Sequence, residues 1–222
     1  MSSKGPRTSI TLADQAGYYF EVGTTMIRRF AAAAIGGYQS LLTVDRESQT
    51  RYYRERGIAH ARKGRYYQAQ GPLESAYKAL PSDTELIYYL GVTLLKTDQT
   101  EDGIALLEKG LQLDPAATKL ASALGMAYIQ KKDYKKAAEA LEKATKDPDA
   151  TYNALYRLGI AYDNLKKYDK ALAAFNAARE KKPDEANVYQ SLGFAYEQSG
   201  DHATAVQYFK KALELEEMAR NK

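Results

Sequence analysis

Five glycines recur through the chain at one constant interval of about 34 residues. They are Gly57, Gly91, Gly125, Gly159 and Gly193. Other positions keep the same interval: after Gly57 come Ala69, Leu73 and Ala76, and each later glycine is followed at the same offsets by alanine or glycine, leucine or phenylalanine, and alanine or glycine. Proline follows three of the five glycines at one fixed offset, as Pro81 follows Gly57. Equal intervals shared by several positions indicate that the chain repeats one structural unit.

Glycine, alanine, a large apolar residue, alanine and proline at a period of about 34 residues form the signature of tetratricopeptide repeats (TPR). On this pattern the chain is identified as a member of the TPR family. The resemblance implies an all-α fold, a right-handed α-solenoid of five repeats in which stacked helix pairs bury a shared core. The five repeats are expected over residues 50–83, 84–117, 118–151, 152–185 and 186–219, followed by a tail at 220–222.

The spacing within one repeat predicts two antiparallel helices. In the fourth repeat we expect the first helix over residues 150–165 and the second over 168–181. Gly159 and Ala171 are small enough to let the two backbones approach, and Phe175 fills the remaining space. Pro183 cannot continue a helix, so it ends the second one.

Polar residues mark the junctions between repeats. Asp83 is expected to cap the first helix of the second repeat, and residues 147–149 that of the fourth. Arg54 lies in the first turn of its own helix, and we predict a structural ion pair between Arg54 and Asp83 that braces the junction. No proline follows Glu217, so the last helix is expected to fray through residues 218–220.

The first fifty residues do not follow the repeat. Residues 1–10 are polar and are expected to be disordered. Residues 11–49 are interpreted as a degenerate helical hairpin that either caps the repeats or docks on another molecule. Its apolar surface exceeds what one neighbouring repeat can cover, which favours docking. The residues expected to dock are Tyr19, Val22, Met26, Phe30 and Leu41.

Composition and motifs exclude several functional classes. The chain has no cysteine, and its net charge of +4 comes from interspersed basic and acidic residues, so we expect no disulfide, no metal site and no nucleic-acid partner. No apolar run reaches the roughly 18 residues of a membrane span. No serine–histidine, zinc-ligand or phosphate-loop arrangement occurs, so no catalytic residue and no cofactor is expected.

A binding groove is the remaining place for function. In a TPR, fixed positions of the first helix face the concave surface, and the ninth position of each repeat is apolar here. An apolar stripe with a mixed polar rim suits an amphipathic helix laid in the groove. The residues expected to bind in the groove are Ile58, Arg62, Tyr88, Tyr89, Val92, Lys96, Met126, Gln130, Asn153, Tyr156, Arg157, Ile160, Asn164, Gln190 and Phe194.

Three segments carry a more specific resemblance. Residues 52–69 (YYRERGIAHARKGRYYQA), 88–97 (YYLGVTLLKT) and 157–172 (RLGIAYDNLKKYDKAL) are similar to the magnetosome-associated TPR scaffold proteins of magnetotactic bacteria. The resemblance implies a cytoplasmic, non-catalytic protein of biomineralisation, held peripherally on the magnetosome membrane through protein partners. It also implies a homo-oligomer in which the N-terminal region enters the neighbour's groove, while the convex face meets other magnetosome proteins.

The residues themselves leave alternatives open. An apolar hairpin and an apolar groove on one chain are complementary surfaces, and a head-to-tail contact between them would give rings or filaments. The alternative is a monomeric TPR adaptor whose groove takes a foreign amphipathic peptide, with residues 11–49 capping the first repeat. A regulatory domain of an enzyme complex is a third hypothesis.

Overall fold

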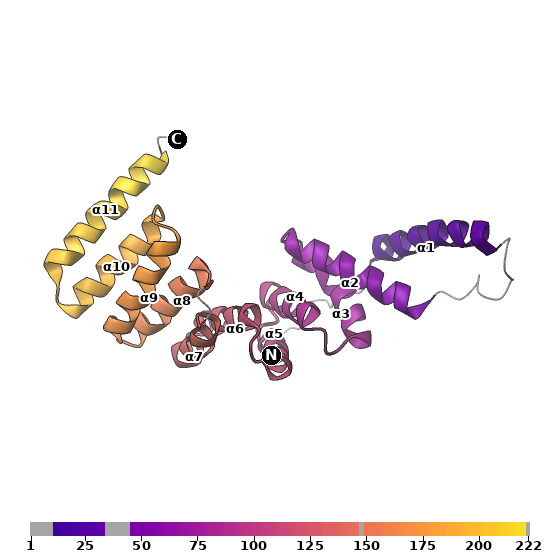
Figure 1. Ribbon diagram of the computed structural model, residues 1–222, viewed down its shortest axis with the longest axis horizontal. Helices are drawn as coiled ribbons and strands as arrows, with labels where there is room; N and C mark the ends of the chain where they lie inside the picture. Colours follow the sequence, from indigo (N-terminus) through magenta and orange to yellow (C-terminus); the bar gives the residue numbers. More distant parts are fainter. Residues whose placement is uncertain (1–10, 34–44, 147–148, 221–222) are drawn as a thin grey trace, which may run out of the picture. The chain divides into compact units, whose positions relative to one another are not determined.

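The computed structural model describes residues 11–33, 45–146 and 149–220, and the regular structure in these ranges is helical (Figure 1). The chain divides after Leu106 into two compact units, Met1–Leu106 and Leu107–Lys222. The helices are α1 (Leu12–Ala33), α2 (Arg46–Arg62), α3 (Tyr66–Ala79), α4 (Thr84–Lys96), α5 (Thr100–Leu113), α6 (Thr118–Gln130), α7 (Tyr134–Ala144), α8 (Tyr152–Asn164), α9 (Tyr168–Lys181), α10 (Ala186–Ser199) and α11 (His202–Arg220).

Consecutive helices pack on one another within each unit. In the first unit α3 packs against both α2 and α4, and in the second unit each helix from α6 to α11 packs against the next (Figure 1). The second helix expected in the fourth repeat, 168–181, coincides with α9, whereas α8 begins at Tyr152, two residues later than expected. The repeated pattern therefore gives the expected helix pairs.

The recurrent glycines are points of closest approach between the two helices of a pair. A Cβ atom added at Gly159 would lie 2.4 Å from Cδ1 of Phe175, and one added at Gly125 would lie 2.4 Å from Cγ of Leu141. Real Cβ atoms do not come this close to another carbon. Phe175 and Leu141 are themselves fully buried, so they have no room to move aside.

The helix caps follow the prediction at one junction and differ from it at another. Asp83 caps α4 and accepts a hydrogen bond of 3.0 Å from the backbone N–H of Leu86. The cap of α8 is Thr151, which accepts from the backbone N–H of Ala154, and not residues 147–149. Because α8 starts at Tyr152, only the residue directly before it can reach the first free N–H groups. Residues 147 and 148 lie outside the described residues.

Arg54 and Asp83 lie together in the first unit. Arg54 Nε is 2.7 Å from Asp83 Oδ2, and Arg54 Nη2 is 2.7 Å from Glu85 Oε2. Burial opposes ionisation of Asp83, but the guanidinium of Arg54 and the N–H of Leu86 outweigh it and hold the pKa of Asp83 below its ordinary value. We infer that this pair braces α2 against the start of α4.

The last helix is longer than expected. The predicted fraying of residues 218–220 is wrong, because α11 continues to Arg220. Proline is absent at the position where it ends three earlier repeats, so nothing stops the helix. Arg220 also pairs with Glu216 one turn earlier, at 3.8 Å, which supports the final turn.

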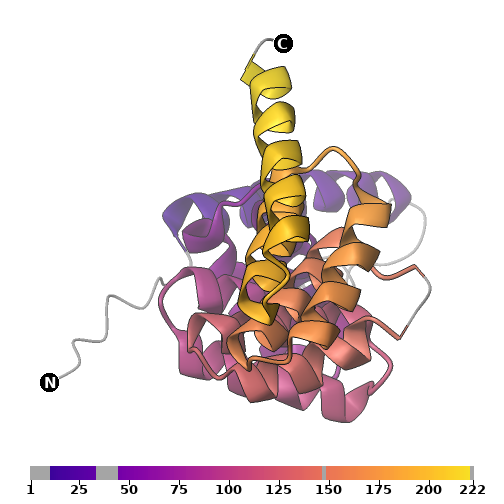
Figure 2. The same cartoon turned by 90° about the vertical axis from the view of Figure 1, so that its left-hand side faces the viewer.

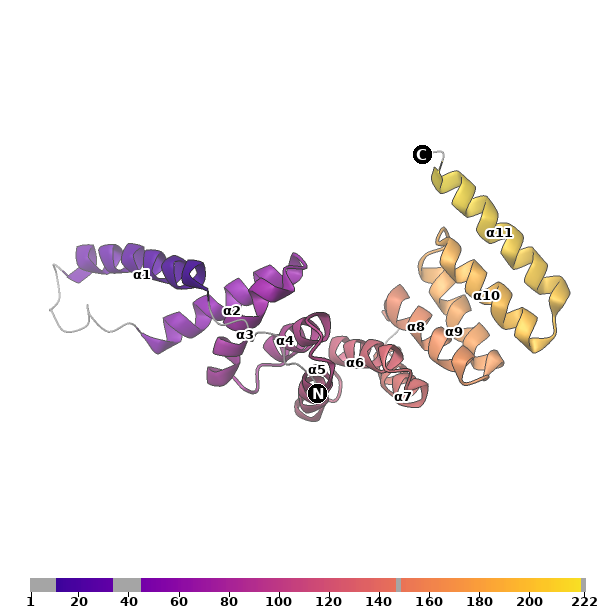
Figure 3. The same cartoon turned by 180° about the vertical axis from the view of Figure 1, so that it is seen from behind.

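The N-terminal helix α1 lies along α2 (Figure 3). Asp14 is 4% exposed, and its Oδ1 is 2.7 Å from Arg56 Nε. Tyr18 is buried between the rings of Tyr52 and Tyr53, with centroid distances of 5.6 and 5.9 Å. One face of α1, which carries Asp14 and Tyr18, therefore packs against α2 of the same chain. The remainder of the predicted hairpin, residues 34–44, and the N-terminal residues 1–10 lie outside the described residues.

The glycine contact gives a stability prediction. Gly159→Ala should lower the free energy of unfolding by about 1 kcal/mol or more, because overpacking against Phe175 costs more than the improved helix propensity returns. Gly23→Ala in α1 is the matched control, since no atom lies within 4 Å of the added Cβ, and it should be neutral or stabilising. Urea unfolding followed by circular dichroism measures both. A Gly159→Ala protein as stable as the wild type would contradict the close-packing account.

The Arg54–Asp83 pair gives a prediction with a defined pH dependence. The depressed pKa of Asp83 means that its contribution is present at neutral pH and is lost as the pH falls below about 4. Asp83→Asn should cost about 1 kcal/mol at pH 7 and reduce this acid dependence. Asparagine caps a helix as well as aspartate does, so the loss reports on the ion pair. Asp184→Asn, at an exposed position, is the control; equal losses in the two variants would count against the brace.

Candidate functional site

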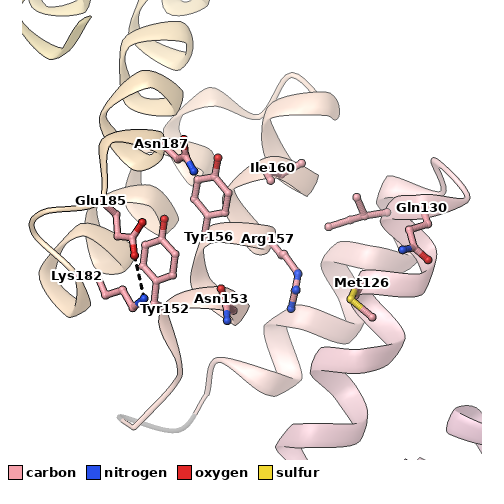
Figure 4. Close-up of a pocket in the computed structure, with 11 residues that line it drawn as sticks. Met126, Gln130, Tyr152, Asn153, Tyr156, Arg157, Ile160, Lys182, Glu185 and Asn187 are labelled. Carbon is pink, nitrogen blue, oxygen red and sulfur yellow. Dashed lines mark hydrogen bonds and ion pairs between the residues drawn. The ribbon is translucent and has the colours of Figure 1, made fainter. Parts of the chain in front are cut away.

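A pocket in the second unit is walled by the first helices of three successive repeats, α6, α8 and α10 (Figure 4). Its volume is about 420 Å³. It therefore lies on the surface where the sequence predicts a binding groove. The lining residues are Met126, Ile129, Gln130, Tyr152, Asn153, Tyr156, Arg157, Ile160, Lys182, Glu185 and Asn187.

One wall of the pocket is aromatic. Tyr152 and Tyr156 are one turn apart on α8, and their rings stack at a centroid distance of 5.6 Å with an interplanar angle of 8°. Lys182 Nζ lies 5.1 Å from the centre of the Tyr152 ring and 2.9 Å from Glu185 Oε1. The hydroxyl of Tyr156 is hydrogen-bonded to Ser191 Oγ at 3.0 Å. These contacts fix the wall before any ligand arrives.

The opposite side of the pocket is apolar with a polar rim. Met126 on α6 and Ile160 on α8 are both partly exposed, and Arg157 extends from α8 into the space between α8 and α6 (Figure 4). Gln130 and Asn153 add amide groups at the rim. This combination is the kind that suits an amphipathic surface, with apolar groups on the floor and polar groups at the amides and Arg157.

Burial, followed by the nearby Glu185 and Tyr156, raises the pKa of Tyr152 to about 12. Its phenol is therefore protonated at neutral pH and keeps a hydrogen atom to donate. The charged groups of the pocket are Arg157, Lys182 and Glu185. Among these lining residues no hydroxyl nucleophile is hydrogen-bonded to a base.

Six residues predicted for the groove line this pocket, and three other predicted residues of the second unit do not. Gln190 donates to Glu216 at 2.6 Å, and Asn164 donates to the backbone oxygen of Ile160 on its own helix. Phe194 is 58% exposed and lies edge-to-face on Phe209. The six that line the pocket are Met126, Gln130, Asn153, Tyr156, Arg157 and Ile160.

In the first unit the predicted groove residues are partly bonded to one another. Arg62 Nε donates to Tyr89 Oη at 2.8 Å, and the rings of Tyr88 and Tyr89 meet edge-to-face at 5.0 Å. Val92 is half-buried and Lys96 is exposed. Ile58 differs from the expectation of an exposed stripe. It is 5% exposed because it belongs to the buried cluster that α4 completes with Leu86, Leu90 and Leu94.

Five residues of the pocket are missing from the predicted set, one of which is Asn187 in the first turn of α10. Ile129 and Tyr152 carry a signal that was available, since each lies three or four residues from a predicted pocket residue on the same helix. Lys182 and Glu185 come from the turn before α10. No periodicity within a helix reports on such residues, because their position depends on how the turn is folded.

The exposed face of α1 is a second surface of interest. Phe20 is 76% exposed and Ile27 71%, and both lie on the side of α1 away from Asp14 and Tyr18. Tyr19 is 66% exposed and lies nearer to α2, with its ring 5.5 Å from that of Tyr18. Val22 and Met26, which were predicted to dock, are partly buried. The side chains of Phe30 and Leu41, also predicted to dock, lie outside the described residues. We define the α1 outer face by Phe20 and Ile27.

Comparison with known proteins identifies the family. The tetratricopeptide-repeat model matches residues 54–118, 88–154, 122–186 and 156–218, which together cover most of the chain. A solved structure of MamA from strain MSR-1 is 37% identical, with a TM-score of 0.71 over 77% of this chain and 98% of that one. A structure of MamA from strain AMB-1 is 40% identical, with a TM-score of 0.71 over 75% and 98%. The chain belongs to the MamA family of tetratricopeptide-repeat proteins.

The resemblance drawn from the sequence is thereby confirmed, as is the all-α TPR solenoid. MamA 41-end from Desulfovibrio magneticus RS-1 is more distant, at 28% identity and a TM-score of 0.70 over 77% of this chain and 96% of that one. Among curated relatives, magnetosome protein MamA of Magnetospirillum gryphiswaldense is 34% identical over 80 residues. That alignment covers 36% of this chain and 37% of the relative, so the chain spans about a third of the length of the curated MamA that it matches.

Residues 11–33, 45–146 and 149–220, which the structure describes, contain neither a bilayer-spanning helix nor a cluster of metal-binding side chains. No helix there has the length and apolar character needed to cross a bilayer. No group of three or more histidine, aspartate or glutamate side chains there is placed to hold a metal ion.

The raised pKa of Tyr152 gives a test of the packing of the pocket wall. Because the folded protein holds the proton up to about pH 12 and the unfolded chain releases it near 10, stability should fall as the pH rises between these values. Tyr152→Phe should make that fall shallower, by up to about 1.4 kcal/mol per pH unit. Tyr67→Phe, at a 63% exposed position, is the control. Urea unfolding at pH 9, 10 and 11 measures the slopes; identical slopes in both variants would contradict the buried wall.

Proposed function

We propose that this chain is a non-catalytic scaffold that self-assembles on the cytoplasmic face of the magnetosome membrane and recruits other magnetosome proteins there. Membership of the MamA family and the magnetosome names of its relatives support the location. In this proposal the chain is held peripherally by protein partners and uses no cofactor, metal or nucleic acid. Its partners are further copies of itself and magnetosome membrane proteins.

The observation that carries this proposal is the complementarity of two surfaces on one chain. The pocket offers an apolar floor at Met126 and Ile160 between an aromatic wall and an amide rim. The α1 outer face offers large apolar side chains on a helix, which is the shape that such a groove takes. A contact between the outer face of one molecule and the pocket of the next joins unlike surfaces, so assembly continues into rings or filaments.

The seat of α1 on α2 is compatible with this assembly. The ion pair between Asp14 and Arg56 and the burial of Tyr18 use one face of α1, and the outer face lies on the other side. In the proposal, the first repeat holds α1 in place and presents it to the neighbouring molecule. This arrangement lowers the entropy lost on association, because the helix is already formed.

The same seat also favours the second candidate, a monomeric adaptor. If α1 only caps the first repeat, the groove is left for a foreign amphipathic peptide. The two candidates differ in one measurable property: the scaffold assembles by itself as its concentration rises, and the adaptor does not.

Charging either surface should therefore dissolve the assembly. The double variant Phe20→Asp with Ile27→Asp should reduce the full-length protein to small species in multi-angle light scattering, because two carboxylates cannot enter the apolar pocket. Met126→Glu and Ile160→Glu should do the same from the other side of the contact. Mixing an α1 variant with a groove variant should not restore long assemblies, since each chain then has one working surface only.

Matched controls add equal charge outside the contact. Gln15→Asp with Thr24→Asp places two carboxylates on exposed positions of α1 that are not part of the outer face, and Ala173→Glu places one on an exposed position of α9 that does not line the pocket. These variants should assemble like the wild type. If the Phe20→Asp, Ile27→Asp protein keeps its assembly size, head-to-tail self-assembly is wrong; if the wild type is a monomer at all concentrations, the adaptor is favoured.

A further inference from the structure

The C-terminal helix α11 exposes a stripe of four residues along one side. Val206, Lys210, Leu213 and Glu217 are separated by four, three and four residues, so they share one face of the helix. All four are exposed, with Val206 at 50% and Leu213 at 57%. Figure 2 shows α11 facing the viewer, with no helix of the second unit in front of it. We call this stripe the α11 outer face.

In the earlier repeats the position of Val206 is covered. The residues at the equivalent position of earlier repeats include Gln70, Ile104 and Ala138, which are 2%, 8% and 5% exposed. Leu172, the next in the series, is half-buried. This position is therefore where one repeat packs against the next. At Val206 the same surface is left open among the described residues.

A further repeat would not find a carboxylate at this opening. In the second unit Glu108 accepts a hydrogen bond from Tyr128 of the following repeat, and Glu142 accepts one from Tyr162 in the same way. The equivalent residue is Asn176 in the fourth repeat, which donates to the backbone oxygen of Leu172 on its own helix. In the fifth repeat it is Lys210, which has no acceptor to offer a tyrosine. Along the repeats this position therefore changes from a carboxylate to an amide and then to a cation.

We propose that a second copy of this chain covers the α11 outer face, with the two α11 helices antiparallel about a two-fold axis near Leu213. Lys210 precedes Leu213 by three residues and Glu217 follows it by four. An antiparallel pair places Lys210 of one chain opposite Glu217 of the other, and the two-fold axis makes this contact twice. A parallel pair would place Lys210 against Lys210. The charge order along the stripe therefore selects the antiparallel arrangement.

The remaining charges of the helix do not compete for this contact. Lys211 pairs with Glu214 at 3.1 Å, and Arg220 pairs with Glu216 at 3.8 Å, each within its own helix.

The length of α11 also favours pairing. It has 19 residues, whereas the second helices of the other repeats have 11 to 14, and the stripe from Val206 to Glu217 is about 17 Å long.

The size of the surface sets the expected affinity. Two helices joined by one stripe bury less than the roughly 1,200 Å² of a stable interface, so the dimer should be weak, with a Kd in the micromolar range. This contact joins like surfaces and closes at two chains. It goes beyond the proposed function, because it uses neither α1 nor the pocket. Where both contacts form, it would link two head-to-tail assemblies side by side.

The test uses the full-length chain carrying Phe20→Asp and Ile27→Asp, so that head-to-tail assembly does not obscure the dimer. Sedimentation equilibrium from about 5 to 500 μM should give a monomer–dimer transition. Lys210→Glu alone or Glu217→Lys alone should raise the Kd at least about fivefold, because each puts like charges in contact. The two changes together should restore it. Gln207→Glu, an exposed position of α11 off the stripe, should have no effect.

Cross-linking gives an independent readout because the chain contains no cysteine. In the same background, Leu213→Cys should form a disulfide-linked dimer on mild oxidation, since the residue meets its own copy at the axis. His202→Cys, at the exposed start of α11, should not. The proposal is overturned if the protein stays monomeric up to 500 μM, if the double charge reversal fails to restore the dimer, or if both cysteine variants cross-link alike. Each of these outcomes leaves the α1 contact untouched.

Discussion

The structure depends on the contact between a glycine in the first helix of a repeat and the large side chain that faces it from the second helix. At Gly159 the buried ring of Phe175 occupies the space that a Cβ would need, and Gly125 has the same relation to Leu141. This contact sets how closely the two helices of a pair approach. The first helix uses one face for this contact, and its other face does not pack against the second helix. In the second unit, residues on those other faces of α6, α8 and α10 line the pocket.

Polar contacts join neighbouring repeats where the glycine contact does not reach. Tyr128 donates to Glu108 and Tyr162 to Glu142, two bonds at equivalent positions of successive repeats. Burial and the adjacent carboxylate raise the pKa of both tyrosines, that of Tyr162 to about 12, so the bonds persist through the physiological pH range. In the next repeat the equivalent residue is Asn176, which donates to its own helix, and in the last repeat it is Lys210. The contact therefore joins some neighbouring repeats and not others.

Features that recur with the repeat could be predicted from the sequence, and features that occur once could not. The bounds of α9 and six residues of the pocket follow from spacing, because spacing decides which side of a helix a residue faces. The cap at Thr151 depends on how one turn is folded. The burial of Ile58 depends on the packing of α4, and the seat of α1 depends on an ion pair between residues 42 positions apart. None of these three features leaves a periodic signal in the sequence.

The account as a whole rests on the claim that α1 of one molecule lies in the pocket of another. Cross-linking mass spectrometry on an equal mixture of 14N- and 15N-labelled full-length protein tests this most directly, because mixed-isotope cross-links arise only between different molecules. With a reagent that couples carboxylates to amines, the account predicts mixed-isotope cross-links from the exposed Glu21 of α1 to lysines around the pocket, such as Lys131 or Lys182. Cross-links from α1 that are confined to single-isotope pairs with α2 and α3 would contradict it.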